Sequence, residues 1–232
     1  MDKAEFDKFA DEYRSLLASS VGITGEGPEY FAEYKVAALR SFCESRSLMD
    51  GVRTILDFGA GTGTSVPYFR KYFPQAQLTC VDVSERSLEV GEERFPGLAR
   101  FQHFNGKDLP FAAASLDIAF AACVFHHIEG EQHVALFEEL KRVIRPGGLI
   151  VVFEHNPLNF LTVRAVNQCP FDENAVLIPA RELRRTLSRL GFSSVDVSYR
   201  LFFPKFLSAL RPLERWLQWC PLGAQYSAIA TV

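Results

Sequence analysis

Three glycines alternate with small residues directly after an apolar run that contains an acid. Ile55-Leu56-Asp57-Phe58 forms the run, and Gly59-Ala60-Gly61-Thr62-Gly63 follows it. Glycine allows a tight turn and a close approach of ligand to backbone, and the amino end of a following helix offers unpaired N–H groups. The pattern therefore predicts a turn that binds a ligand with a carboxylate or phosphate group.

The spacing argues against two common nucleotide-binding patterns. A Walker loop requires Lys and Ser or Thr after its last glycine, but Gly63 is followed by Thr64-Ser65-Val66. The dinucleotide fingerprint requires G-x-G-x-x-G, whereas the glycines here are spaced G-x-G-x-G. Asp57 precedes the first glycine by two residues, where a carboxylate repels a pyrophosphate and attracts an amino group. S-adenosylmethionine (SAM) carries such an amine, so the pattern favours SAM.

A second acid ends the next predicted strand. Asp82 lies in Val81-Asp82-Val83-Ser84, 19 residues after Gly63. A carboxylate at this place can accept hydrogen bonds from both hydroxyls of a ribose. An acid at a strand end is often only a solvated loop residue, but the glycine turn upstream makes the ribose role the better interpretation.

Alternating strands and helices must position these residues. Their period predicts an α/β fold with a doubly wound, mainly parallel sheet. The predicted strands are TILDF, QLTCVDV, ARFQHF, LDIAFAACVF, GGLIVVFEH, SVDVSYRLFF and QYSAIATV. Four helices are predicted after the glycine turn. The first ends near Phe73 and the second begins at Ser84, and the other two are EGEQHVALFEELKRVI and PARELRRTLSRLGF.

The period of the apolar residues changes near residue 50. Helical spacing before it predicts an N-terminal helical lid over residues 1–50, with one helix from Phe6 to Leu17 and another from about Pro28 to Ser47. Residues 51–232 are expected to form the core. Within it, residues 155–178 form a long connection, which is either a substrate lid or an ordinary loop.

Composition limits the classes of partner. The chain has 232 residues, a formal net charge of -3 and no long block of like charge, which argues against nucleic-acid binding. No signal peptide and no membrane span is expected, so we predict a cytoplasmic monomer or homodimer. The five cysteines are scattered and never spaced C-x-x-C, so we predict reduced thiols and no metal ligands.

Five segments of the chain carry a resemblance to a known family: ILDFGAGTG, VDVS, NGKDLPF, SLDIAFAACVFHHI and LKRVIRPGGLIVV. In this order they resemble the motifs of class I SAM-dependent methyltransferases, closest to the type 11 or ubiquinone-type subgroup. The resemblance implies a Rossmann-like sheet of seven strands with the last antiparallel, and transfer of the SAM methyl group to a small-molecule, glycan or lipid-like acceptor, with S-adenosylhomocysteine as product. Oxygen is the favoured acceptor atom. C-methylation of a quinone or polyketide, or a regulatory protein that binds SAM without turnover, are the alternatives. The resemblance extends over about residues 50 to 155.

The resemblance also implies where the cofactor lies. Gly59 and Gly61 are expected against its methionine part, Asp57 at its amino group and Asp82 at its ribose. In the adenine segment, Asn105 stands where the family usually has Asp, and its amide oxygen is expected to accept from adenine. The other predicted cofactor-binding residues are Gly106, Ala60, Val83, Cys123, Tyr13 and Lys35.

Three of these residues have a further interpretation. Tyr13 lies in FDKFADEYR, which resembles a family pattern whose tyrosine reaches into the cofactor pocket. Lys35 either pairs with the cofactor carboxylate or is a plain solvated lysine. Cys123 lies in an apolar run, so its side chain is expected to be a small buried hydrophobe.

Two pairs of residues at strand ends are candidate catalytic residues. His126 and His127 follow the fourth strand, and Glu154 and His155 follow the fifth. Methyl transfer requires alignment of the acceptor and, for a hydroxyl, removal of its proton, which a histidine can accept near neutral pH. The alternative is that one histidine packs under the sheet and the other only shapes the pocket. Neighbours in an extended segment, such as 154 and 155, normally point to opposite faces.

Aromatic residues gather near the carboxyl end of the chain. They could line an acceptor groove or face a membrane, but a packed helix is the expected outcome. The residues are Phe202, Phe203, Phe206, Trp216 and Trp219.

Overall fold

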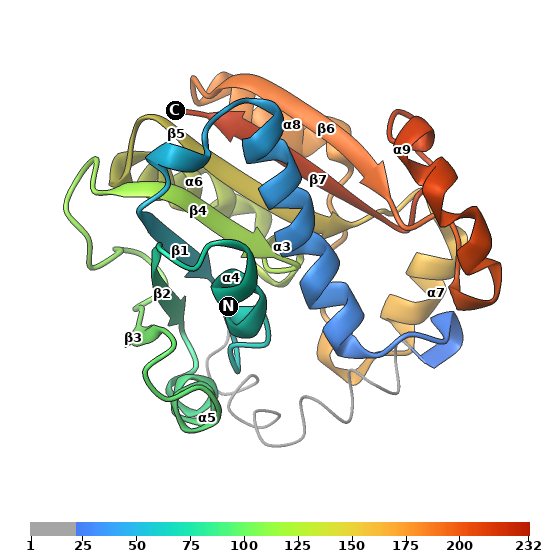
Figure 1. Ribbon diagram of the computed structural model, residues 1–232, viewed down its shortest axis with the longest axis horizontal. Coiled ribbons are helices and arrows are strands. Elements are labelled where there is room, and N and C mark those ends of the chain that lie inside the picture. Colours follow the sequence, from blue (N-terminus) through green and yellow to red (C-terminus); the bar gives the residue numbers. More distant parts are fainter. Residues whose placement is uncertain (1–21) are drawn as a thin grey trace.

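The structure is a computed structural model, and it describes residues 22–232. The predicted helix from Phe6 to Leu17, which includes Tyr13, lies outside the described residues. Figure 1 shows a twisted central sheet with helices on both of its faces.

Seven strands form one sheet in the order β3-β2-β1-β4-β5-β7-β6. Every neighbouring pair is parallel except the two that involve β7, which runs antiparallel to β5 and to β6. The prediction of a doubly wound sheet with an antiparallel last strand is therefore confirmed. The strands are β1 (Thr54–Phe58), β2 (Gln77–Asp82), β3 (Arg100–His103), β4 (Leu116–Ala122), β5 (Ile144–His155), β6 (Ser193–Arg200) and β7 (Gln225–Thr231).

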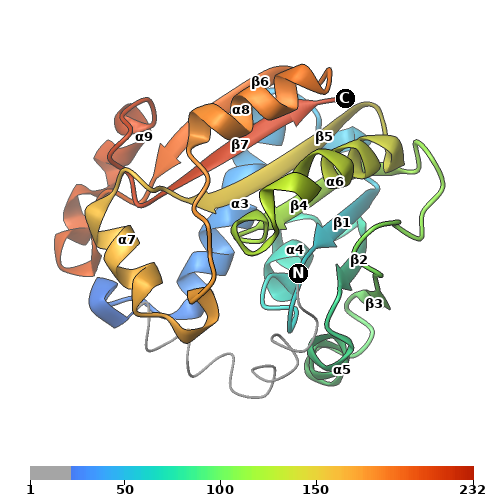
Figure 2. The same cartoon turned by 180° about the vertical axis from the view of Figure 1, so that it is seen from behind.

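Helices cover the sheet from two sides. α3 (Pro28–Ser45) and α4 (Val66–Tyr72) lie on the face toward the viewer in Figure 1, and α6 (Gly130–Val143) and α8 (Ala180–Arg189) lie on the face shown in Figure 2. The remaining helical elements are η1 (Gly22–Thr24), η2 (Met49–Gly51), α5 (Glu85–Arg94), η3 (Phe125–His127), α7 (Phe160–Asn167), η4 (Pro170–Asp172), η5 (Lys205–Leu213) and α9 (Glu214–Leu217).

The central strands are buried on both faces because apolar side chains alternate between two cores. Phe120 of β4 packs with Leu39 of α3 on one face, and Ala119 packs with Leu140 of α6 on the other. This is the arrangement expected of parallel strands between two layers of helices.

The sheet order brings two distant loops to one edge. β1 and β4 are neighbours, although β2 and β3 lie between them along the chain. At such a reversal the loops after the two carboxyl ends run in opposite directions and leave room for a ligand. The glycine turn follows β1 and η3 follows β4, so both meet at this edge.

Two parts of the chain differ from expectation. Residues 155–178 are not wholly irregular, since α7 and η4 lie within them. The expectation that the aromatic segment near the carboxyl end forms a packed helix is wrong. Neither η5 nor α9 has a buried residue, and Phe206 and Trp219 are 81% and 77% exposed. Apolar spacing alone does not show whether another element covers a helix.

Among the described residues, no helix combines the length and the apolar character that crossing a membrane requires.

The amino edge of the sheet is tied together by Asp117, at the start of β4. One of its carboxylate oxygens accepts from the backbone N–H groups of Arg53 and Thr54, each at 2.8 Å, and the other accepts from Arg145 Nε at 2.5 Å. Burial raises the pKa of Asp117, but these hydrogen bonds outweigh burial and lower it overall.

We predict that Asp117→Asn lowers the free energy of unfolding by about 1.5–3 kcal/mol at pH 7, because an amide NH₂ would face donors that need an acceptor. A lowered folded-state pKa contributes stability above the unfolded pKa, and this contribution is lost as pH falls through the folded value. The difference between wild type and variant should therefore shrink below about pH 4. Urea unfolding at pH 7 and pH 3 measures both effects, and equal stabilities at pH 7 would contradict the role.

Candidate functional site

The glycine turn after β1 has the backbone conformation that its sequence demands. Gly59, Gly61 and Gly63 have φ values of +70°, +52° and +73°, in the left-handed region that favours glycine. The N–H of Gly59 donates to the carbonyl of Val81 at 2.8 Å, and the N–H of Gly61 donates to Asp82 Oδ2 at 2.8 Å. The turn is therefore fixed to the end of β2.

Two of these glycines have different surroundings. A Cβ on Gly59 would stand 2.6 Å from both methyl carbons of Val124, so the packing of the protein itself requires glycine there. A Cβ on Gly61 would meet no heavy atom within 4 Å. The space in front of Gly61 is thus open, and a ligand can approach the backbone there.

Asp57 adds a buried carboxyl group with an unsatisfied oxygen to the same place. Its side chain is 3% exposed, and its Oδ2 has no hydrogen-bond partner. Burial, and then the nearby charge of Asp82, raise the pKa of Asp57 to about 8, although Lys35 lowers it. A buried acceptor without a donor is costly, so the site fits a ligand that brings a donor, such as an ammonium group.

Two more of the predicted contact residues, Asp82 and Asn105, are held by local hydrogen bonds. Asp82 Oδ1 accepts from the N–H of Ser84 at 2.9 Å, and a carboxylate that already accepts from Gly61 still has lone pairs to offer a ribose. Asn105 differs from expectation, because its amide oxygen already accepts from Lys107 and Asp108 at 2.8 Å each. That oxygen closes a turn, which argues against the predicted contact through it.

Lys35 and Cys123 form a contact that neither sequence pattern indicated. Lys35 is 7% exposed, and its Nζ lies 3.2 Å from Cys123 Sγ. Burial opposes ionisation of the thiol, but Lys35 and then His155 outweigh it and lower the pKa of Cys123 to about 7. The interpretation of Lys35 as a solvated lysine is therefore wrong, and Cys123 is more than a small hydrophobe.

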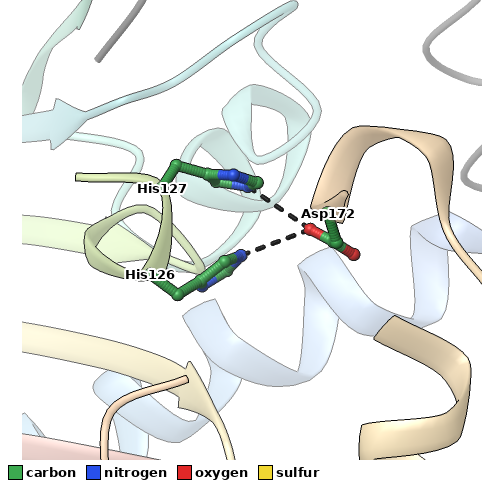
Figure 3. A group of neighbouring side chains, drawn as sticks. All are labelled: His126, His127 and Asp172. Carbon is green, nitrogen blue, oxygen red and sulfur yellow. Dashed lines mark ion pairs between the residues drawn. The ribbon is translucent and has the colours of Figure 1, made fainter. Parts of the chain in front are cut away.

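A cluster of polar side chains lies at the ends of β4 and β5. His126 is 2% exposed, and its Nδ1 lies 2.5 Å from Glu154 Oε2. Its Nε2 lies 3.4 Å from Asp172 Oδ1, and His127 Nε2 lies 3.4 Å from the same oxygen. Figure 3 shows both imidazoles directed at Asp172.

Glu154 fixes the turn that carries the two histidines. It is fully buried, and its Oε1 accepts from the N–H of Phe125 at 2.8 Å and of Val124 at 3.2 Å. The ring centroid of His155 lies 5.1 Å from that of His126, so both members of the Glu154-His155 pair reach His126. Adjacent side chains normally point to opposite faces of an extended segment, but here both lie against the same histidine.

The electrostatics of the cluster argue against a histidine base. Burial opposes a charge on His126, but Glu154 and Asp172 outweigh it and raise the pKa of His126 to about 10. Burial, and then the charge on His126, lower the pKa of His127 to about 3. At neutral pH His126 therefore stays protonated and His127 stays neutral. Neither histidine titrates near neutral pH, where a general base needs its pKa.

Asp172 is the site residue that the sequence did not single out. It comes from η4, in the connection 155–178, and lies 46 positions after His126. The N–H of Val176 donates to the carbonyl of His126 at 2.8 Å, which fastens the connection over η3. The only sequence signal was an acid in a long insert directly after a strand that ends in Glu-His.

Comparison with known proteins decides the family. The family model described as "Methyltransferase domain" matches residues 56–152. A malonyl-[acyl-carrier protein] O-methyltransferase of Halalkalibacterium halodurans is 30% identical over 197 residues, which cover 78% of this chain and 70% of that protein. The chain belongs to the class I SAM-dependent methyltransferases.

Other relatives extend this result. A trans-aconitate 2-methyltransferase of Rhodopseudomonas palustris is 29% identical over 71% of this chain and 59% of its own length, and an O-methyltransferase of Penicillium expansum is 29% identical over 62% and 53%. The chain thus spans little more than half the length of those curated relatives. A solved SAM-dependent methyltransferase of Thermotoga maritima, described as a possible histamine N-methyltransferase, shares the fold with a TM-score of 0.68, 20% identity and 98% of each chain covered.

The family match has an informative limit. It includes the glycine turn, Asp82 and both histidines of this methyltransferase, but it ends at residue 152. Glu154, His155 and Asp172 lie beyond it. The polar cluster therefore combines two residues inside the matched segment, His126 and His127, with residues outside it.

We predict that SAM binding at pH 7 releases close to one proton per ligand, because Asp57 with a pKa of about 8 is mostly protonated beforehand and must ionise to face an ammonium group. Affinity should accordingly rise between pH 6 and pH 7.5. Calorimetric titration in buffers of different ionisation enthalpy counts the proton. Asp57→Asn should release none and bind SAM about 10- to 100-fold more weakly; unchanged proton release in this variant would contradict the assignment.

Gly61→Val should abolish measurable SAM binding, because the valine side chain would fill the open space in front of the turn. Gly97→Val is a matched control, since Gly97 also has a positive φ, of +71°, and a Cβ added there would likewise meet no heavy atom within 4 Å. Both variants should lose roughly 1–2 kcal/mol of stability through backbone strain. Only the first should lose SAM in calorimetry, and retained affinity there would show that the ligand lies elsewhere.

Proposed function

We propose that this protein transfers the methyl group of SAM to an oxygen atom of a small or lipid-like acceptor. The observation that carries the proposal is the unpaired Oδ2 of Asp57 beside the open face of Gly61. The ammonium group of a ligand would donate to Asp57 Oδ2, and the rest of that ligand would occupy the open space in front of Gly61.

The cofactor role of each residue follows from its position. Asp57 would hold the amino group, the turn Gly59 to Gly61 would lie along the methionine part, and Asp82 would hold the ribose. Ala60, Val83 and Gly106 would also contact the cofactor. Val83 and Gly106 are neighbours, since a Cβ on Gly106 would stand 3.9 Å from Val83 Cγ1. Bound SAM supplies a methyl group already activated by the sulfonium, so the protein's remaining task is to align the acceptor and exclude water.

Lys35 has a second task in this proposal. The Lys35 ammonium contacts Cys123 Sγ and lowers the pKa of Asp57. Its positive charge therefore partly offsets the negative charges of the cofactor site. From this position it would partner the cofactor carboxylate while Asp57 partners the amine. One cation and one anion would then match the two ends of an amino acid group.

The acceptor would lie over the polar cluster, at the same sheet edge. His127 and Asp172 are mostly covered but keep a small exposed fraction, 15% and 13% of their side chains, at which they would hold a hydroxyl or carboxylate oxygen. The names of the relatives agree with oxygen, since they include a malonyl-[acyl-carrier protein] O-methyltransferase and an O-methyltransferase. We infer that residues 155–178 act as a substrate lid and residues 1–50 as an N-terminal lid.

Apolar side chains near the same edge favour an acceptor with an apolar part. Leu158, Phe160 and Leu161 are 63%, 75% and 61% exposed at the start of α7. α7 and the η5–α9 segment lie side by side beyond the carboxyl end of β5 (Figures 1 and 2). Trp216 of α9 and Trp219, two residues after its end, are 59% and 77% exposed.

Two measurements test the proposal. Calorimetry with SAM and S-adenosylhomocysteine should show binding of both, and a methyl-release assay should show turnover with at least one acceptor from a panel of hydroxy acids, glycans and lipid-linked alcohols. Mass spectrometry of the product identifies the methylated atom, and Gly61→Val is the inactive control. Binding without turnover over the whole panel would favour a regulatory protein that binds SAM, and no binding of either ligand would overturn the proposal.

A further inference from the structure

Three atoms able to bind a metal ion converge in the polar cluster. They are His126 Nε2, His127 Nε2 and Asp172 Oδ1, and all lie within 4.8 Å of one another. The Asp172 oxygen is 3.4 Å from each nitrogen (Figure 3). Ligand atoms about 2.1 Å from a tetrahedral zinc ion stand about 3.4 Å apart, so the spacing suits one ion between them.

The surroundings of His126 resemble a built metal site. A metal-bound histidine usually uses its other ring nitrogen to hydrogen-bond a carboxylate, which fixes the direction of the ring. Glu154 lies 2.5 Å from His126 Nδ1 and is itself fixed by the N–H of Phe125. Glu154, which is buried, therefore fixes the His126 ring so that its Nε2 points at Asp172.

The three groups are also held rigidly and nearly out of water. The side chains of His126, His127 and Asp172 are 1%, 15% and 13% exposed. The two histidines belong to η3, and the hydrogen bond from Val176 to His126 fastens the segment that carries Asp172. Little ordering would accompany uptake of an ion.

The charge and number of the ligands indicate the class of ion. Two imidazoles and one carboxylate suit a divalent transition metal such as zinc, cobalt or iron better than magnesium or calcium. Together with Glu154, the cluster offers two carboxylates, whose charge a divalent ion balances. Three protein ligands leave a position open, as in catalytic rather than structural zinc sites.

We propose that His126, His127 and Asp172 bind one divalent transition metal ion, which displaces the proton of His126 Nε2 to solvent. Glu154 orients His126 through Nδ1, and the open position is available to an oxygen ligand. Metal binding goes beyond the proposed function and does not depend on it. The role that follows, in which the ion holds the acceptor oxygen and eases loss of its proton, rests on the proposed methyl transfer.

The test uses the untagged full chain, stripped with a chelator and dialysed. Titration with Co²⁺, followed by visible absorption, and with Zn²⁺, followed by calorimetry, should each show one ion per chain. His127→Ala and Asp172→Asn should bind either ion about 100-fold more weakly or worse. His103→Ala removes a histidine that is 40% exposed on the surface, and it should bind like wild type.

Circular dichroism separates loss of the site from loss of the fold. Asp172→Asn keeps the size and shape of the side chain, so it should keep the circular dichroism spectrum and the cooperative unfolding of the stripped wild type while failing to bind Co²⁺. Wild type that takes up neither ion, or both variants binding as tightly as wild type, would overturn the metal site and leave only a proton-bridged network. Metal uptake together with absence of SAM binding would support the site while overturning the proposed function.

Discussion

The buried carboxylate of Glu154 holds together the turn on which the polar half of the site is built. It accepts from two consecutive backbone N–H groups and from the imidazole of His126. A fully buried carboxylate is stable only when its acceptor capacity is filled, so the backbone of η3 and the ring of His126 have little freedom. The direction of His126, the place of His127 beside it and the meeting of both with Asp172 follow from that single constraint.

The cofactor half of the site shows the same physics with the charges arranged differently. Asp57 and Asp82 end neighbouring strands, β1 and β2, and burial next to a second carboxylate leaves Asp57 short of a cation. Lys35 supplies part of the balance from α3, yet Asp57 Oδ2 keeps no partner. On the cofactor side, a buried acid is therefore poised for a positive group that a ligand brings. A structure designed only for stability would have filled these places with apolar residues.

The parts of this arrangement that could be predicted are those encoded by neighbours in sequence. Strand and helix periods gave the sheet, and the glycine spacing with Asp57 gave the turn, because each depends on a few adjacent residues. Asp172, and the contact of Lys35 with Cys123, depend on elements that meet only after folding, so no local pattern contained them. Asn105 shows a different limit: its type allowed an adenine contact, but its oxygen is taken by two backbone groups of its own turn.

The connection after β5 joins the two kinds of surface that an amphiphilic acceptor would need. Its later part carries Asp172 into the polar cluster, while its first part leaves Leu158, Phe160 and Leu161 largely in water. Exposed apolar side chains of this size are costly unless a ligand or partner covers them for part of the time. Because one segment of about twenty residues holds both ends, an acceptor whose polar group reaches Asp172 would lay its apolar part toward α7. Closure of this segment would then join recognition of the apolar part to alignment of the reacting oxygen.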